Sequence, residues 1–156
     1  MTEVKKIMDT KLFHTDDNEI AEAGEILRNG GLVAFPTETV YGLGASAFDS
    51  DAAKKIYAAK GRPSDNPLIV HICDKGQIKD IAEEIPESAK KVIDNFMPGP
   101  VTIILKKKSV VPNDVTAGLD TVAIRFPLHE TAQKLIKAAG VPIAAPSANL
   151  SGKPSP

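Results

Sequence analysis

The stretch Leu32-Val33-Ala34-Phe35-Pro36-Thr37-Glu38-Thr39-Val40-Tyr41-Gly42-Leu43-Gly44 decides how the chain is interpreted. It begins with a short, continuous apolar run, which is typical of a buried strand that ends at Pro36. The residues after Pro36 are rich in turn formers, as in a loop. Because loops at strand ends of α/β scaffolds often carry binding residues, this stretch predicts both a sheet and a site beside it.

Helices and strands are expected to alternate on both sides of this stretch. Upstream, a helix begins near Asp16 with Glu19 as its capping-box partner, and Gly30-Gly31 ends it. Downstream, helices are expected from 49 or 50 to about 60 and at 77–84, 87–96 and 130–139, and strands at 68–73, 101–105, 122–126 and 143–145. Because two strands follow each other without a helix between 101 and 126, the fold class is α/β with a mixed (parallel and antiparallel) sheet and flanking helices.

Composition limits the class of protein. The 156 residues fit one domain, and 42% hydrophobic and 25% charged residues are ordinary for a globular protein. With 19 basic and 20 acidic residues the net charge is −1, which argues against a dedicated nucleic-acid coat but leaves room for a local basic cavity.

Several other classes are excluded by residue usage. A single cysteine, Cys73, rules out an intramolecular disulfide and a multi-thiolate metal site, and its apolar surroundings favour an inert buried thiol over a nucleophile. The three histidines lack metal-ligand spacing, and His14 and His129 are expected at the surface. The charged N-terminus has no apolar core of a secretory signal, and no run reaches the roughly 20 apolar residues that span a bilayer. We therefore expect a cytoplasmic protein with no membrane association.

Two short polar groups are candidate anion sites. Lys60 and Arg62 flank Gly61 at the end of an expected helix, where Lys60 could either offset the helix dipole or bind an anion. Ser147 and Asn149 follow an expected strand and Pro146, so they form either an ordinary turn or a site for phosphate oxygens or ribose. Neither group has the spacing of a Walker P-loop, and Gly42-Leu43-Gly44 lacks the third glycine of a dinucleotide fingerprint.

Two polar residues lie within expected strands. His71 is either a satisfied core histidine or, with Thr39 and Arg125 as neighbours, part of a pocket for a zwitterion. Arg125 needs an anionic partner, from the protein or from a ligand, if its strand is buried.

Taken together, these motifs resemble one family. The motifs are Ala34 to Gly44, Lys60-Gly61-Arg62-Pro63, Asn66-Pro67-Leu68, Pro98-Gly99-Pro100-Val101-Thr102 and Ala145-Pro146-Ser147-Ala148-Asn149. They are similar to those of the YrdC-like family of threonylcarbamoyl-AMP synthases, in the same order, over nearly all of the chain from about Gly31 onward. The resemblance implies a twisted mixed sheet around a central basic cavity. It also implies a nucleotidyltransferase that joins L-threonine, bicarbonate and ATP, with Mg²⁺ accompanying ATP, and releases pyrophosphate.

The resemblance also implies roles for individual residues. The K-x-R element falls on Lys60 and Arg62, which would be the catalytic residues, with no metal ligand among the protein side chains. The implied ATP-binding residues are Lys60, Arg62, Asn66, Thr121, Ser147 and Asn149. The implied threonine-binding residues are Thr39, His71 and Arg125, and Arg125 would take the carboxylate. The product would serve the threonylcarbamoyladenosine modification of tRNA, so tRNA or a downstream threonylcarbamoyl-transferase complex is an expected partner.

Residues 1–156 are expected to form a single YrdC-like domain that is incomplete at its C-terminus, because domains of this family continue into further strands. Two alternatives remain open. The chain could be an RNA-binding module for double-stranded RNA or tRNA without catalysis. The small number of aromatic residues and the near-neutral charge argue against this alternative. The chain could also be a carbamoyl-transfer or maturation module, which dependence on threonine would distinguish.

Overall fold

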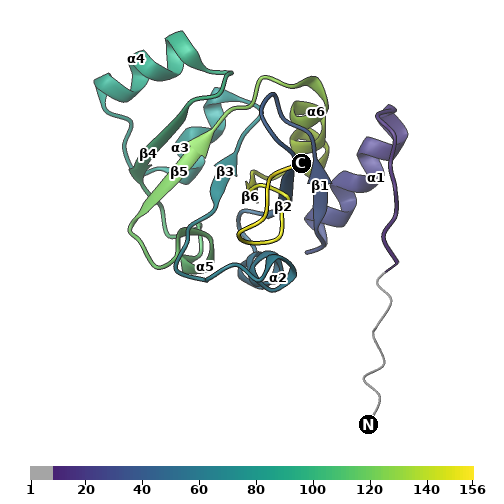
Figure 1. Cartoon of the computed structure of the whole chain (residues 1–156). Helices are drawn as coiled ribbons and strands as arrows, with labels where there is room; N and C mark the ends of the chain where they lie inside the picture. The colour runs from purple at the N-terminus through teal and green to yellow at the C-terminus, as the bar shows by residue number, and fades with distance from the viewer. Residues whose placement is uncertain (1–8) are drawn as a thin grey trace.

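A six-stranded sheet runs through the molecule in the order β1-β2-β6-β3-β5-β4 (Figure 1). The computed structural model describes residues 9–156. The strands are β1 (Val33–Phe35), β2 (Gly42–Ser46), β3 (Ile69–His71), β4 (Thr102–Lys106), β5 (Thr121–Arg125) and β6 (Ile143–Ala145). Strands β3 and β5 pair in parallel and all other neighbours pair antiparallel, which confirms the mixed α/β sheet.

The helices are α1 (Asp17–Arg28), α2 (Ser50–Lys60), α3 (Ile78–Ile81), α4 (Glu87–Phe96), α5 (Asn113–Thr116) and α6 (Glu130–Ala139), with a 3₁₀ turn at Lys75–Gln77 before α3. Side-chain caps mark the start of two of these α-helices, α1 and α2, among the described residues. The Asp16 side chain accepts a hydrogen bond from the Glu19 amide at 3.0 Å, as expected of an N-cap. The prediction of a complete capping box is wrong. The Glu19 carboxylate accepts a hydrogen bond from the backbone amide of His14 rather than from that of Asp16.

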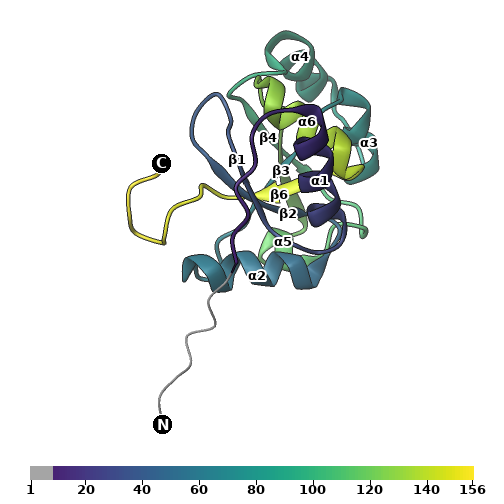
Figure 2. The same ribbon diagram turned by 90° about the vertical axis from the view of Figure 1, so that its right-hand side faces the viewer.

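Two apolar clusters hold the helices against the sheet. The larger contains buried residues of α2, α3 and α5, which pack on one face of the central strands around Val70, Ile124 and Ala144. The smaller joins α1 and α6 to β1 and β6 around Phe35 and Ile143. Helices α1 and α6 lie side by side next to the β1 end of the sheet (Figures 1 and 2).

Part of the sheet face that carries Phe35 stays uncovered by helices within residues 9–156. The register places Thr102, Ile104 and Lys106 of β4 on this face, and Ile104 is 68% exposed. Figure 2 shows that the loop between β1 and β2 and the segment after β6 extend to one side of the sheet. The open face therefore lies beside the loops that carry most of the candidate residues.

Some expectations about the elements are wrong. The run before Pro36 is an edge strand with Ala34 exposed, not a buried strand. Residues 42–46 form strand β2 instead of continuing the loop, and the short helix α5 was not expected. The glycines of β2 hid the strand, yet they fit the packing: a Cβ on Gly44 would lie 2.7 Å from Cγ2 of Ile143.

Boundaries elsewhere differ by a few residues. The helix expected at 77–84 is shortened to α3, and the strand expected at 68–73 is shortened to β3. The N-terminal charges that argue against a secretory signal lie largely in residues 1–8, outside the described residues.

Candidate functional site

Lys60, Ser147 and Asn149 meet at one point, although more than 80 residues separate Lys60 from the other two. Lys60 is the last residue of α2, and only 4% of it is exposed. Its ammonium donates hydrogen bonds to the carbonyl oxygen of Ser147, to that of Asn149 at 2.7 Å and to Oδ1 of Asn149 at 3.4 Å. The Ser147 hydroxyl donates to the same Oδ1. The two sequence motifs are therefore one cluster.

These contacts differ from simple capping of the helix by Lys60, and anion binding at this residue remains a prediction. Its ammonium binds carbonyls of the 147–149 loop and not the last carbonyls of its own helix, which Gly61 closes in the left-handed conformation at φ 61°. Burial, followed by the positive charge of Arg62, lowers the pKa of Lys60 below its usual value. Among residues 9–156 this buried ammonium meets only neutral oxygens, which compensate its charge less well than an anion does.

Arg62 and Asn66 lie in the loop that follows α2. The Arg62 side chain donates from Nε to the carbonyl oxygen of Asn66 at 3.2 Å and from Nη2 to that of Pro67 at 3.0 Å. The Tyr57 hydroxyl donates to the same Asn66 carbonyl at 3.2 Å. Arg62 therefore braces its own loop, while the Asn66 side chain remains exposed.

Thr121 stands apart from this cluster. It begins β5 opposite Lys106 of β4, on the same sheet face as Arg125 but at the other end of the strand. No hydrogen bond joins its side chain to Lys60, Arg62 or Ser147 in the part of the chain that the structure describes. Its role as a nucleotide contact remains a prediction.

The three residues expected to bind threonine do come together. Parallel pairing of β3 with β5 places His71 beside Arg125, and Arg125 Nη2 donates to the Thr39 hydroxyl at 3.1 Å. The His71 ring packs edge-on against Phe35, with ring centroids 5.7 Å apart, and its Nδ1 lies 2.9 Å from the carbonyl oxygen of Ile69. Burial, followed by the charge of Arg125, lowers the pKa of His71 from 6.5 to about 4, so the ring is neutral at pH 7.

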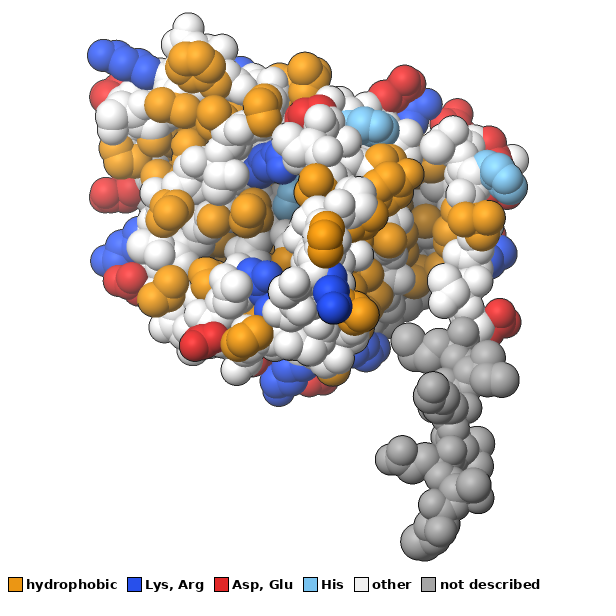
Figure 3. All heavy atoms as spheres, in the orientation of Figure 1, with side chains coloured by type: hydrophobic (Ala, Val, Ile, Leu, Met, Phe, Trp, Pro, Cys, Tyr) orange, Lys and Arg blue, Asp and Glu red, His pale blue; other side chains and the backbone are white. Residues whose placement is uncertain are grey.

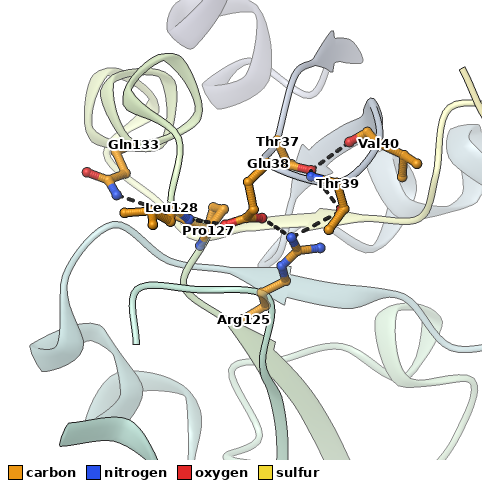
Figure 4. Close-up of polar contacts among 8 residues, drawn as sticks. All are labelled: Thr37, Glu38, Thr39, Val40, Arg125, Pro127, Leu128 and Gln133. Carbon is orange, nitrogen blue, oxygen red and sulfur yellow. Dashed lines mark hydrogen bonds and ion pairs between the residues drawn. The ribbon is translucent and has the colours of Figure 1, made fainter. Parts of the chain in front are cut away.

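Glu38 is a site residue that the sequence reasoning missed. Arg125 Nη2 donates to Oε1 of Glu38, and the amide of Leu128 donates to Oε2 (Figure 4). The expected anionic partner of Arg125 is therefore a carboxylate of the protein. The Nε atom of Arg125 is nevertheless buried and has no hydrogen-bond partner within residues 9–156. The stretch Pro36 to Gly44 contains Glu38, but nothing in the local pattern pairs it with a residue 87 positions away.

Backbone hydrogen bonds tie the two clusters to each other. The amide of Leu43 donates to the carbonyl oxygen of Pro146 at 3.0 Å, and the amide of Ala148 donates to that of Tyr41 at 2.8 Å. The loop that carries Thr39 and the loop that carries Ser147 are thus neighbours. Figure 3 shows Lys, Arg and His side chains near the middle of this face of the molecule. The central basic cavity remains a prediction, and two shallow hollows along α6 are not lined by any candidate residue.

The other titratable residues of the described part of the chain include Cys73, His14 and His129. No group of three or more His, Cys, Asp or Glu side chains within residues 9–156 is arranged to hold a metal ion. Cys73 is half-buried, and burial raises the pKa of its thiol, which keeps it protonated. His14 is exposed as expected, whereas His129 is only partly so, because its Nδ1 is buried without a hydrogen-bond partner in the described part of the chain.

The fold and the clusters define a class of protein: a mixed-sheet α/β domain whose polar loops at strand ends bring cationic, hydroxyl and amide groups together. A comparison with protein families then assigns it. The Sua5/YciO/YrdC family model, described as telomere recombination, matches residues 25–156. The chain belongs to this family, which confirms the resemblance found in the motifs.

Relatives of known name are similar over most of the chain. The threonylcarbamoyl-AMP synthase of Bacillus subtilis is 60% identical over 148 residues, and that of Pyrococcus abyssi is 59% identical over 138 residues. These matches cover 94% and 88% of this chain but only 43% and 41% of the respective relatives. The chain therefore spans less than half the length of these relatives.

Solved structures support the fold. The crystal structure of Pyrococcus abyssi Sua5 complexed with L-threonine matches with a TM-score of 0.89 and 57% identity, covering 90% of this chain and 42% of that one. Among residues 9–156, none of the helices has the length and apolar character needed to cross a membrane. The cytoplasmic location remains a prediction.

Proposed function

We propose that this chain carries the nucleotide and amino-acid sites of a threonylcarbamoyl-AMP synthase, which joins L-threonine, bicarbonate and ATP and releases pyrophosphate. The observation that carries the proposal is the cluster of Thr39, His71 and Arg125 next to the cluster of Lys60, Ser147 and Asn149. The names of the Bacillus and Pyrococcus relatives and the L-threonine complex of Pyrococcus Sua5 support the choice of substrates.

On the amino-acid side, Arg125 would bind the threonine carboxylate. Its Nη1 makes no hydrogen bond to the described residues and, unlike the buried Nε, is open to an incoming carboxylate. Neutral His71 would line the same pocket without competing for the carboxylate. Thr39 would place its hydroxyl beside the guanidinium.

On the nucleotide side, Lys60 and Arg62 would offset the negative charge of ATP, and the Ser147 hydroxyl and the Asn149 amide would bind its oxygens, assisted by Asn66 and Thr121. Mg²⁺ would arrive with the ATP phosphates as part of the substrate. An anion would also compensate the buried ammonium of Lys60, which meets only neutral oxygens among the described residues.

The chemistry requires little from the protein beyond positioning and charge. The threonine amine would capture bicarbonate with loss of water, or CO₂ with loss of a proton, to form a carbamate. A carbamate oxygen would then attack the α-phosphorus of ATP. The bond from the α-phosphorus to the oxygen that bridges it to the β-phosphorus would break, and the β- and γ-phosphoryl groups would leave together as pyrophosphate. The main energetic cost is the repulsion between several anions brought together, and the positive charges of Lys60 and Arg62 would reduce that repulsion.

The test begins with binding of Mg-ATP and of L-threonine to the chain by calorimetry, followed by pyrophosphate release with each substrate left out in turn. We expect release that needs both threonine and bicarbonate. Arg62→Ala and Ser147→Ala should abolish nucleotide use and leave the fold intact. Lys54→Ala and Ser88→Ala, at exposed helix positions, are the matched controls and should behave as wild type.

Three outcomes would contradict the proposal. Full turnover in Arg62→Ala and Ser147→Ala would remove those residues from the site. Release that ignores threonine would exclude the amino-acid pocket and favour a different carbamoylating reaction. Salt-sensitive binding of tRNA without any binding of ATP would favour an RNA-binding module instead. Passage of the product to tRNA or to a transferase complex belongs to the same proposal and is tested by adding them.

A further inference from the structure

We propose that Glu38 is a positioning residue of the amino-acid site: it holds the guanidinium of Arg125 in the orientation that receives a substrate carboxylate. This inference rests on the proposed function. It adds a residue that acts through Arg125 and makes no contact with the substrate.

The first argument is the two-point attachment of Glu38. One carboxylate oxygen accepts from Nη2 of Arg125, at the end of β5, and the other accepts from the backbone amide of Leu128, beyond that strand. Figure 4 shows the carboxylate lying between these two donors. Only 19% of the Glu38 side chain and 12% of the Arg125 side chain is exposed, so water screens the ion pair weakly. Glu38 thereby joins the loop after β1 to the segment after β5.

The second argument is that both ends of this bridge are themselves fixed. On the Glu38 side, the Thr37 hydroxyl donates to the carbonyl oxygen of Val40 at 2.6 Å, which closes the loop locally. On the Leu128 side, Nε2 of Gln133 in α6 donates to the carbonyl oxygen of Pro127 at 2.9 Å. A carboxylate held between two anchored segments sets the direction of the guanidinium.

The third argument is the number of donors left on Arg125. A guanidinium has five N–H donors, and the two of Nη2 serve Glu38 and Thr39. Nε–H is buried without a partner within residues 9–156. Fixing Nη2 therefore keeps Nη1, which makes no hydrogen bond to the described residues and is not buried, in a constant place where a ligand can reach it.

The decisive substitution is Glu38→Gln, which preserves shape but leaves a single acceptor oxygen. Both partners of Glu38 are donors, so glutamine must leave either Arg125 or Leu128 unsatisfied. Hydrogen bonds to charged groups contribute about 1.5–3 kcal/mol, so we expect the dissociation constant for L-threonine to rise about tenfold or more. The dissociation constant for Mg-ATP should not change. Glu130→Gln removes an equal charge at an exposed position of α6 and should leave both constants unchanged.

A measurement without ligand completes the test. In wild type, the amide of Leu128 should exchange its hydrogen slowly because it is bonded to Glu38, and Glu38→Gln should accelerate the exchange. If Glu38→Gln fails to fold, Gln133→Met loosens the Pro127 anchor more mildly and should weaken threonine binding in the same direction, again without affecting Mg-ATP.

The outcomes separate the inference from the proposed function. Wild type that does not bind threonine would overturn both. Wild type that binds threonine while Glu38→Gln binds it equally well would overturn the role of Glu38 alone. Tighter binding by Glu38→Gln would show that Glu38 competes with the substrate, and equal losses for threonine and Mg-ATP would show a general structural role; either result refutes positioning.

Discussion

Replacing Lys60 by methionine tests whether its ammonium holds the 147–149 loop in place. Methionine keeps an unbranched apolar stem of similar length in a site that is only 4% exposed, and it removes every donor. The carbonyl oxygens of Ser147 and Asn149 then lose their shared partner. The substitution therefore acts on the loop and not on the packing of α2.

The magnitude follows from two opposing effects. A part-buried acceptor left without its donor costs about 1–3 kcal/mol, and two carbonyls are affected. Removing a desolvated ammonium returns part of that cost, as the lowered pKa of Lys60 indicates. We expect a net loss of about 1–3 kcal/mol in the free energy of unfolding.

Urea denaturation measures this loss, and hydrogen exchange locates it. The amide of Lys153, which bonds to the carbonyl oxygen of Leu150 at 2.9 Å in the same segment, should exchange faster in Lys60→Met. Lys54→Met places the same substitution at an exposed position of α2 and should stay within about 0.5 kcal/mol of wild type. Ser147→Ala keeps the carbonyl that Lys60 binds and should retain the slow exchange. Equal stability of Lys60→Met and Lys54→Met, with unchanged exchange at Lys153, would refute the reasoning.

Two further predictions concern the core beside the site. The pKa of His71 is lowered to about 4 in the folded protein. Between pH 6.5 and 4, His71 therefore binds a proton in the unfolded chain but not in the folded protein. The contribution of this residue to the free energy of unfolding is therefore complete above about pH 6.5. It falls by about 3 kcal/mol as the pH drops toward 4, at 1.36 kcal/mol per pH unit. When the free energy of unfolding in urea is plotted against pH, His71→Gln should flatten the curve in this window, and the exposed control His14→Gln should not. Gly44→Ala should cost about 1–3 kcal/mol because its Cβ would lie 2.7 Å from Ile143 and 2.9 Å from Phe35; an unchanged urea midpoint would show that these side chains shift freely.

Much of the fold could be predicted because local residues mark its elements. Helices α4 and α6 run over the expected residues, since Pro86 stands at the N-cap of one and Gly140 closes the other at φ 71°. Strand β2 was missed because its glycines and alanine have weak strand propensity. It exists because β1 and β6 pair with it on both sides, which no local pattern reveals.

The site, like the fold, could be predicted only as far as local sequence features mark it. The sequence singles out Arg125 because it lies within an expected strand, and Lys60 and Ser147 because they lie in short polar motifs at the ends of an expected helix and an expected strand. It cannot tell which oxygen each one contacts, because those contacts depend on register: pairing Val70 with both Ile124 and Ala144 is what places β5 and β6 on either side of β3. A slip of one residue would turn Arg125 to the opposite, helix-covered face.

Glu38 shows why this limit matters for function. Glu38 lies between Thr37 and Thr39, a sequence context that does not distinguish it from other loop carboxylates. An ion pair made by an exposed glutamate would contribute almost nothing to the stability of the fold. In the structure, Glu38 is instead the carboxylate that pairs with the largely buried guanidinium of Arg125. An arginine that pairs with a protein carboxylate and, as proposed, also receives a substrate carboxylate needs a protein partner that occupies only part of its donors. The contact of Glu38 with one nitrogen of Arg125, shared with Thr39, meets that requirement.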